Sequence, residues 1–221
     1  MEGKPRLHYF NGRGRMECIR WLLAAAGVEV RCGFIQIIFD TNKWKNIPCG
    51  TLMYGQHLPM VETHGMNLVE TRAILRYIPA KYDLYGGNLK EQAWIHMYVE
   101  GLNDLSNMIM FLPLSLPEEE MNLAYILEKA TTRFFPVCEK PRKSHQWRVW
   151  YFLVCNWLSW ADTQQPKIIL MTEECKPSVL LGFPLLQKFK ARSKSIETVK
   201  NTFKLERGMF LKNMTSTVAE Y

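Results

Sequence analysis

The pattern of apolar and polar residues in the first third of the chain predicts alternating strands and helices. Short apolar runs bounded by turn residues predict strands, which lie at residues 6–10, 28–38, 58–62 and 66–69. Apolar residues at helical spacing predict helices over 15–26 and 70–82, the first ending at Gly27, a typical C-terminal stop. Together they predict a β-α-β unit with a parallel strand pair, followed by a β-hairpin and a helix.

From residue 89 onward the strand signals almost vanish, and the pattern predicts helices only. One long helix covers 89–112, and another starts at Pro117 with three glutamates in its first turn and runs to about residue 140. Ser159-Trp-Ala-Asp162 is a capping box that begins a helix, and a further helix opens at Phe183. We therefore predict an α/β domain over 1–86, a linker near 85–88, and an all-α domain over 87–221.

Composition fits a globular protein that builds its core without metals or disulfides. The chain has 221 residues, of which 48% are hydrophobic and 22% charged. No apolar run approaches the roughly 20 residues that a bilayer span requires, so we expect no membrane span. No apolar signal segment follows the N-terminus, so the cytosol is the expected location. The six cysteines are scattered without metal-ligand spacing, which predicts free thiols and no metal site.

The net charge of +7 raises the possibility of a nucleic-acid partner. The basic residues are spread over the chain, however, and the local excess between Lys188 and Lys212 alternates with apolar residues at helical spacing. That pattern is more typical of the solvated face of a helix than of a nucleic-acid patch. We therefore expect no nucleic-acid partner.

Generic catalytic motifs are absent: the sequence has no phosphate-binding loop, dinucleotide fingerprint, nucleophile elbow or His-Glu-x-x-His. What remains is a set of residues at predicted strand and helix ends. Tyr9 lies at the end of the first strand, and Arg15 follows in the loop before a helix. Pro59 begins a later strand, and Glu70-Thr71 opens a helix. Each alone could be purely structural, as a strand aromatic, a surface loop or a helix cap.

Taken in order, these residues resemble one family. The chain resembles a diverged member of the alpha class of cytosolic glutathione transferases. The similarity is densest at Lys4-Pro-Arg-Leu-His-Tyr-Phe-Asn-Gly-Arg-Gly-Arg and continues through Leu58-Pro-Met-Val-Glu, Thr71-Arg-Ala-Ile-Leu and Leu158-Ser-Trp-Ala-Asp to about residue 203. The resemblance implies a thioredoxin-like N-terminal domain that binds glutathione and an all-helical C-terminal domain that forms the electrophile pocket and part of a dimer interface.

The implied activity is conjugation of the glutathione thiolate to hydrophobic electrophiles, as in detoxification of xenobiotics. The resemblance makes Tyr9 and Arg15 catalytic: the Tyr9 hydroxyl stabilises the thiolate, and the Arg15 charge lies beside the sulfur. Glutathione is a co-substrate, and no cofactor is implied. The positions implied to bind glutathione are Tyr9, Lys45, His57, Leu58, Pro59, Glu70, Thr71, Asp104 and Arg133.

The family pattern also implies a dimer, either of identical chains or with a related subunit. Asp104 and Arg133 match positions that approach glutathione across the interface, and Tyr54 matches an aromatic that inserts into the partner. Pro59 matches a cis-proline whose preceding backbone pairs with the cysteinyl part of glutathione.

The sequence also departs from the family. Glu70 stands where the alpha class usually has glutamine, the loop after Asn46 is longer, and Pro79 and Pro166 fall inside predicted helices. An interior proline costs about 3 kcal/mol. These changes leave open a second reading, a catalytically weak or inactive paralogue that binds glutathione or hydrophobic anions. A disulfide oxidoreductase is disfavoured because no cysteine lies at the end of the first strand.

Overall fold

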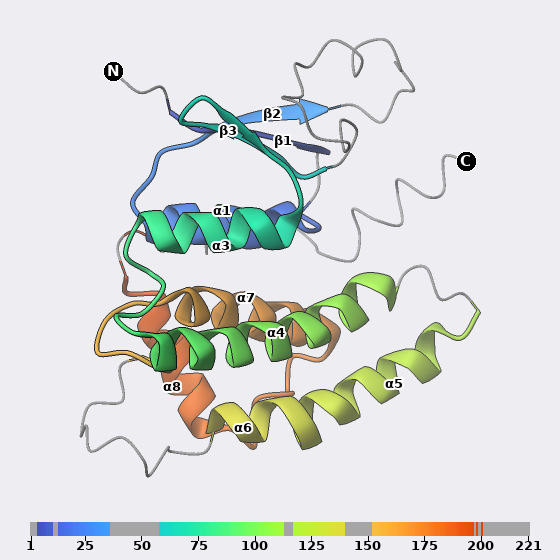
Figure 1. Ribbon diagram of the computed structural model, residues 1–221. Helices are drawn as coiled ribbons and strands as arrows, with labels where there is room; N and C mark the ends of the chain where they lie inside the picture. Colours follow the sequence, from blue (N-terminus) through green and yellow to red (C-terminus); the bar gives the residue numbers. More distant parts are fainter. Residues whose placement is uncertain are drawn as a thin grey trace.

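The structure is a computed structural model that describes residues 4–10, 13–35, 58–112, 117–139, 152–196, 198 and 200. A small sheet lies at one side, with α1 and α3 packed against it, and the remaining helices form a second body beyond that helical layer (Figure 1). This arrangement confirms the predicted fold class, an α/β domain followed by a helical one. Among the described helices, none is both long and apolar enough to cross a bilayer.

The first domain contains one sheet and two of the described helices. Its elements are β1 (Arg6–Phe10), α1 (Met16–Ala25), β2 (Arg31–Ile35), β3 (Met60–Thr63), β4 (Met66–Leu68) and α3 (Thr71–Lys81). The strand order is β2-β1-β3-β4, with β1 parallel to β2 and antiparallel to β3, and with β3 antiparallel to β4. The β-α-β unit and the hairpin therefore occur as predicted.

Two strands begin later than the sequence pattern predicts. The predicted strand from residue 28 starts at Arg31, because the residues before it still close α1: the Gly27 and Val28 amides donate to the Ala24 and Leu23 carbonyls. Strand β3 begins at Met60 because Pro59, directly before it, has no N–H to donate to a neighbouring strand.

The described part of the second domain contains helices and no strands. Its elements are α4 (Leu89–Phe111), α5 (Glu119–Lys129), a π-helical turn (Ala130–Phe134), α6 (Phe135–Glu139), α7 (Trp160–Cys175) and α8 (Pro184–Ser193). The predicted linker lies between α3 and α4, and its last residue, Asn88, caps α4 by accepting a hydrogen bond of 3.0 Å from the Glu91 amide.

The start of α7 is fixed by the predicted capping box. Asp162 accepts from the Ser159 amide at 2.9 Å and, through its other oxygen, from the Leu153 amide at 2.6 Å. Asp162 is 3% exposed. Burial raises the pKa of its carboxyl to about 6, against the opposing effect of the hydrogen bonds from Ser159 and Leu153. One buried carboxyl thus holds both the helix start and the segment before it.

Pro166 lies inside α7 and is buried, as the sequence predicts. A proline there lacks the amide that would bond the Asp162 carbonyl. We expect Pro166→Leu to raise the melting temperature by several degrees, since about 1 kcal/mol shifts a domain of this size by roughly 2–4 °C. Pro184→Leu is the matched control, because Pro184 is the first residue of α8, where no helical hydrogen bond is lost. Scanning calorimetry measures the melting temperatures of both variants. Equal shifts for Pro166→Leu and Pro184→Leu would contradict this expectation.

The hydrophobic core of the first domain continues into the second. Leu7, Ile19 and Ile74, from the sheet, α1 and α3, belong to the same buried cluster as Ile95 of α4 and Trp160 of α7. A separate buried cluster, which includes Leu105, Phe135 and Ile169, lies wholly among the helices of the second domain. Helix α7 therefore lies at the junction, with residues in both clusters.

Candidate active site

The Tyr9 hydroxyl lies over the turn that leads into α1. It accepts a hydrogen bond of 3.1 Å from the Arg15 backbone amide. Gly14, in the same turn, has φ +38°, and a Cβ atom at that position would lie 2.5 Å from the Tyr9 oxygen. Only glycine lets the turn pass so close to the hydroxyl. The oxygen is thus held by the backbone, and a tyrosine hydroxyl that accepts still carries one hydrogen to donate.

The two arginines of this turn have different surroundings. Arg13 forms an ion pair of 3.0 Å with Glu174 of α7, so it ties the turn to the helical domain. Arg15 is exposed, and no carboxylate of the described residues pairs with it. Its side chain lines a cavity instead. Of the two, Arg15 is therefore the one placed to act on a ligand.

The N-terminus of α3 offers backbone donors to the same cavity. Glu70 precedes the helix with φ 66° and ψ 112°, a conformation that L-residues rarely adopt. Such strain in a non-glycine residue suggests a functional constraint. Thr71 is the first residue of α3, where backbone N–H groups have no partner within the helix and suit an anion.

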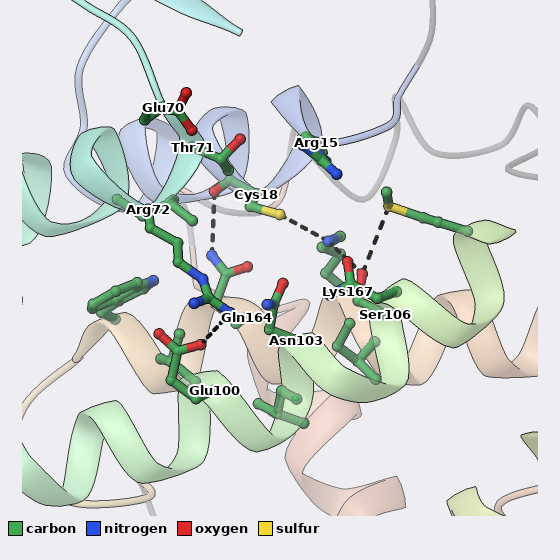
Figure 2. A pocket seen from close by; sticks show the side chains of 17 residues that line it. Arg15, Cys18, Glu70, Thr71, Arg72, Glu100, Asn103, Ser106, Gln164 and Lys167 are labelled. Carbon is green, nitrogen blue, oxygen red and sulfur yellow. Dashed lines mark hydrogen bonds and ion pairs between the residues drawn. The ribbon is translucent and has the colours of Figure 1, made fainter. Parts of the chain in front are cut away.

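The cavity between the two domains has a volume of about 280 Å³. Arg15, Glu70 and Thr71 line it from the first domain, and residues of α4 and α7 line it from the second (Figure 2). Glu100 of α4 pairs with Arg72 at 3.1 Å on its rim. The structure therefore brings three of the predicted site residues to one cavity.

The other predicted residues lie elsewhere. The Leu58–Pro59 peptide bond is cis, as the resemblance implies, and directly precedes β3, although neither residue lines the cavity. Asp104 and Arg133 face each other at 3.9 Å on an exposed surface of α4 and the π-helical turn, away from the cavity of their own chain. Lys45, His57 and Tyr54 lie outside the described residues, so their predicted roles stay predictions.

Sequence reasoning missed the residues that the helical domain contributes. Gln164 and Lys167 of α7 and Ser106 of α4 line the cavity, together with Cys18 of α1. A signal was present: Gln164 and Lys167 follow Trp160 at four and seven positions, on one face of a helix whose start the capping box fixes. Within the described residues, no group of three or more His, Cys, Asp or Glu side chains could hold a metal.

Comparison with known proteins identifies the family. Residues 5–80 match the family model for the glutathione S-transferase N-terminal domain, and residues 103–204 match a C-terminal domain model of the same family. The chain is 53% identical over 201 residues to glutathione S-transferase A2 of Bos taurus, covering 90% of this chain and 87% of the relative. It is 51% identical to glutathione S-transferase A3 of Homo sapiens, covering 90% and 88%.

Solved structures agree with this assignment. The fold is similar to the Pi-class glutathione S-transferase of Onchocerca volvulus, with a TM-score of 0.72, 25% identity, and 91% and 93% of the two chains covered. The glutathione S-transferase of Ascaris lumbricoides has the same fold, with a TM-score of 0.75, 21% identity, and 94% and 99% covered.

A thioredoxin-like domain joined to a helical one, with a cavity between them, defines the class of protein. The chain belongs to the glutathione S-transferase family. Its similarity to the alpha class, inferred above from short motifs, is confirmed by relatives such as glutathione S-transferase alpha M14 of Sus scrofa, 53% identical over 201 residues.

Proposed function

We propose that the chain conjugates glutathione to hydrophobic electrophiles, with Tyr9 as the group that stabilises the thiolate. The observation that carries the proposal is the position of the Tyr9 hydroxyl. Its oxygen accepts the Arg15 amide at 3.1 Å, above a glycine turn that admits no side chain. A hydroxyl held in this way keeps its position when charge develops on a nearby sulfur, which is the requirement for electrostatic stabilisation.

The magnitude of one hydrogen bond is sufficient for this role. An ordinary thiol has a pKa of about 8.5, so little of it is ionised at neutral pH. A hydrogen bond to a charged group contributes about 1.5–3 kcal/mol, equivalent to one to two pKa units. The Tyr9 hydroxyl alone could therefore make much of a bound thiol ionised at neutral pH, and the positive charge of Arg15 would act in the same direction.

The tripeptide would be held by the strained turn and helix start beside the cavity. Thr71 and the first amides of α3 suit the γ-glutamyl carboxylate, and the Glu70 carboxylate suits the γ-glutamyl ammonium. The backbone before Pro59 would pair with the cysteinyl part. Lys45 and His57 complete the proposed site. Glutathione serves as co-substrate with no further cofactor, and the cytosol is the proposed location.

The site would be shared between two chains. Met97, Asp104 and Phe111 lie seven residues apart along α4 and therefore face the same side of that helix. Met97 and Phe111 are 66% and 53% exposed, which is unusual for large apolar side chains. Arg133 lies beside Asp104 on this surface. An isologous dimer formed here would present Asp104 and Arg133 of each chain to the other.

We expect the chain to sediment as a dimer at micromolar concentration. Tyr54→Ala should shift it toward the monomer, since a buried aromatic anchor carries a large share of an interface's binding energy. Analytical ultracentrifugation of the two proteins measures this. Tyr125→Ala is the control, because Tyr125 is an exposed aromatic on α5. A monomeric wild-type protein would contradict the proposed interface.

The function itself is tested by retention on immobilised glutathione, followed by turnover of glutathione with an aryl halide. Retention and turnover together are the expected result. Retention without turnover, at any pH between 6 and 9, would replace the proposal with a binding protein for glutathione.

A further inference from the structure

A thiol, an amine and a hydroxyl from three helices meet at the wall of the interdomain cavity. The Lys167 amine on α7 lies 2.9 Å from the Cys18 sulfur on α1 and 3.2 Å from the Ser106 hydroxyl on α4 (Figure 2). Their exposed fractions are 1% for Lys167, 7% for Cys18 and 3% for Ser106. All three nevertheless line the cavity, so a molecule inside it would touch them.

The hydrogen bonds of the lysine go to a thiol and a hydroxyl. Among the described residues its hydrogen bonds go to Cys18 and Ser106, and no carboxylate forms an ion pair with it. The Lys167 nitrogen donates to the Cys18 sulfur at 2.9 Å, so it lies within reach of the proton that the thiol gives up when the sulfur bonds to carbon.

Two other partly or fully buried thiols, Cys155 and Cys175, lie near carboxylates instead. Burial, together with the Glu91 carboxylate, raises the pKa of Cys155 to about 12. Burial, together with the Glu174 carboxylate, raises the pKa of Cys175 to about 11. Both thiols stay protonated at neutral pH and are poor nucleophiles. The Cys18 sulfur instead accepts a hydrogen bond of 2.9 Å from the Lys167 nitrogen.

A second feature of the cavity indicates what the ligand carries. Trp160 lines the cavity and is 1% exposed, and no residue that the structure describes accepts a hydrogen bond from its indole Nε1. A buried donor without an acceptor is rare and suggests that a ligand supplies one. A carbonyl oxygen is such an acceptor. The volume of about 280 Å³ suits a small molecule, since drug-sized ligands occupy roughly 300–1,000 Å³.

We propose that Cys18 is a covalent modification site for small α,β-unsaturated carbonyl compounds, with Lys167 as the proton acceptor. The sulfur bonds to the β-carbon of the compound, and the carbon–carbon π bond breaks to give an enolate. The thiol proton passes to Lys167 and then to the α-carbon, so the lysine ends as it began. The product is a thioether in which thiol and electrophile have added without any oxidant or leaving group.

The adduct would fill the cavity beside Arg15 and Thr71, the proposed glutathione site. The modification itself is independent of the proposed function, whereas the resulting loss of conjugation rests on it. Detection of the adduct by mass therefore separates the failure of one proposal from the failure of the other.

The experiment uses the purified full chain and but-3-en-2-one at neutral pH, with each cysteine followed by peptide mass spectrometry. We expect Cys18 to gain one probe molecule faster than Cys155 or Cys175. Lys167→Met should slow labelling of Cys18 by about a hundredfold, the range of general-base assistance. Lys167→Arg should also slow it, because a guanidinium cannot accept the proton. Labelling of Cys32, which is exposed, is the internal reference and should not change.

Ser106→Ala is the matched control, since it removes the other hydrogen-bond partner of the Lys167 amine but leaves the proposed proton acceptor of the Cys18 thiol in place. In this variant Cys18 should react at nearly the wild-type rate. Cys18→Ser should lose the label and resist inactivation by the probe. If the wild-type protein is labelled at Cys32 but not at Cys18, the proposal is overturned. This result does not depend on whether any variant folds. Equal labelling of Cys18 in Lys167→Met, with circular dichroism unchanged, would also overturn it.

Discussion

Tyr9→Phe is expected to lower the rate of glutathione conjugation at neutral pH by about ten- to a hundredfold. The change keeps the ring and removes the hydroxyl that Arg15 holds at 3.1 Å. Loss of one charge-assisted hydrogen bond should raise the pKa of the bound thiol by about one to two units, and each unit is a factor of about ten in rate. The measurement is the pH–rate profile of kcat/KM, in which the deficit should shrink at high pH, where the thiol ionises unaided.

Two controls sharpen this experiment. Tyr77→Phe makes the same chemical change at a hydroxyl that lies 3.3 Å from His64, and it should leave the profile unchanged. Gly14→Ala keeps the hydroxyl but places a Cβ atom where it would lie 2.5 Å from the Tyr9 oxygen, so it should reproduce part of the loss. Full activity of Tyr9→Phe at pH 7 would show that another group stabilises the thiolate.

Asp162→Ala is expected to have the largest effect on stability, a loss of about 2–6 kcal/mol in the free energy of unfolding. The change leaves the Ser159 and Leu153 amides without their acceptor, and each unsatisfied buried donor costs about 1–3 kcal/mol. Urea unfolding measures the change. Glu118→Ala is the control, because Glu118 precedes α5 without capping it, and a loss similar to that of Asp162→Ala would contradict this account.

The same carboxyl should make stability depend on pH. Its pKa is about 6 in the folded state, raised from an ordinary value of 3.8. Below pH 4 both states hold the proton, whereas between pH 4 and 6 the folded state holds it and the unfolded state releases it. The advantage of wild type over Asp162→Asn should therefore fall as pH rises from about 4 to about 6, by about 3 kcal/mol in total, and stay level above that. A difference that grows with pH would mean that the hydrogen bonds outweigh burial.

The ends of helices were predictable from the sequence where a few neighbouring residues determine them. The capping box at Ser159 and Asp162 fixes the start of α7 from four residues, and Gly27 marks the end of α1. The later start of β2 was not predictable from apolar residues alone. Val28 and Val30 are apolar, but the Gly27 and Val28 amides complete the end of α1 rather than a strand ladder.

The site was predictable only in its first-domain half. Tyr9, Arg15, Glu70 and Thr71 lie in or next to short motifs, so a resemblance could identify them. The contact between Cys18 and Lys167 joins residues 149 positions apart, and neither belongs to a motif. Whether a lysine in an otherwise buried helix faces a carboxylate or a thiol depends on how α1 packs against α7, which no local pattern encodes.

The buried cluster that joins Leu7 and Ile74 to Ile95 and Trp160 has a consequence for how the two halves of the chain can change over evolution. A chimaera that joins residues 1–86 of this chain to the second half of a relative would combine two halves of different cores. Mismatched core volumes typically cost about 1–3 kcal/mol. We expect such chimaeras to melt at a lower temperature than both parents in calorimetry. The two halves are matched by separate family models, but they share one core and are therefore expected to change together during evolution.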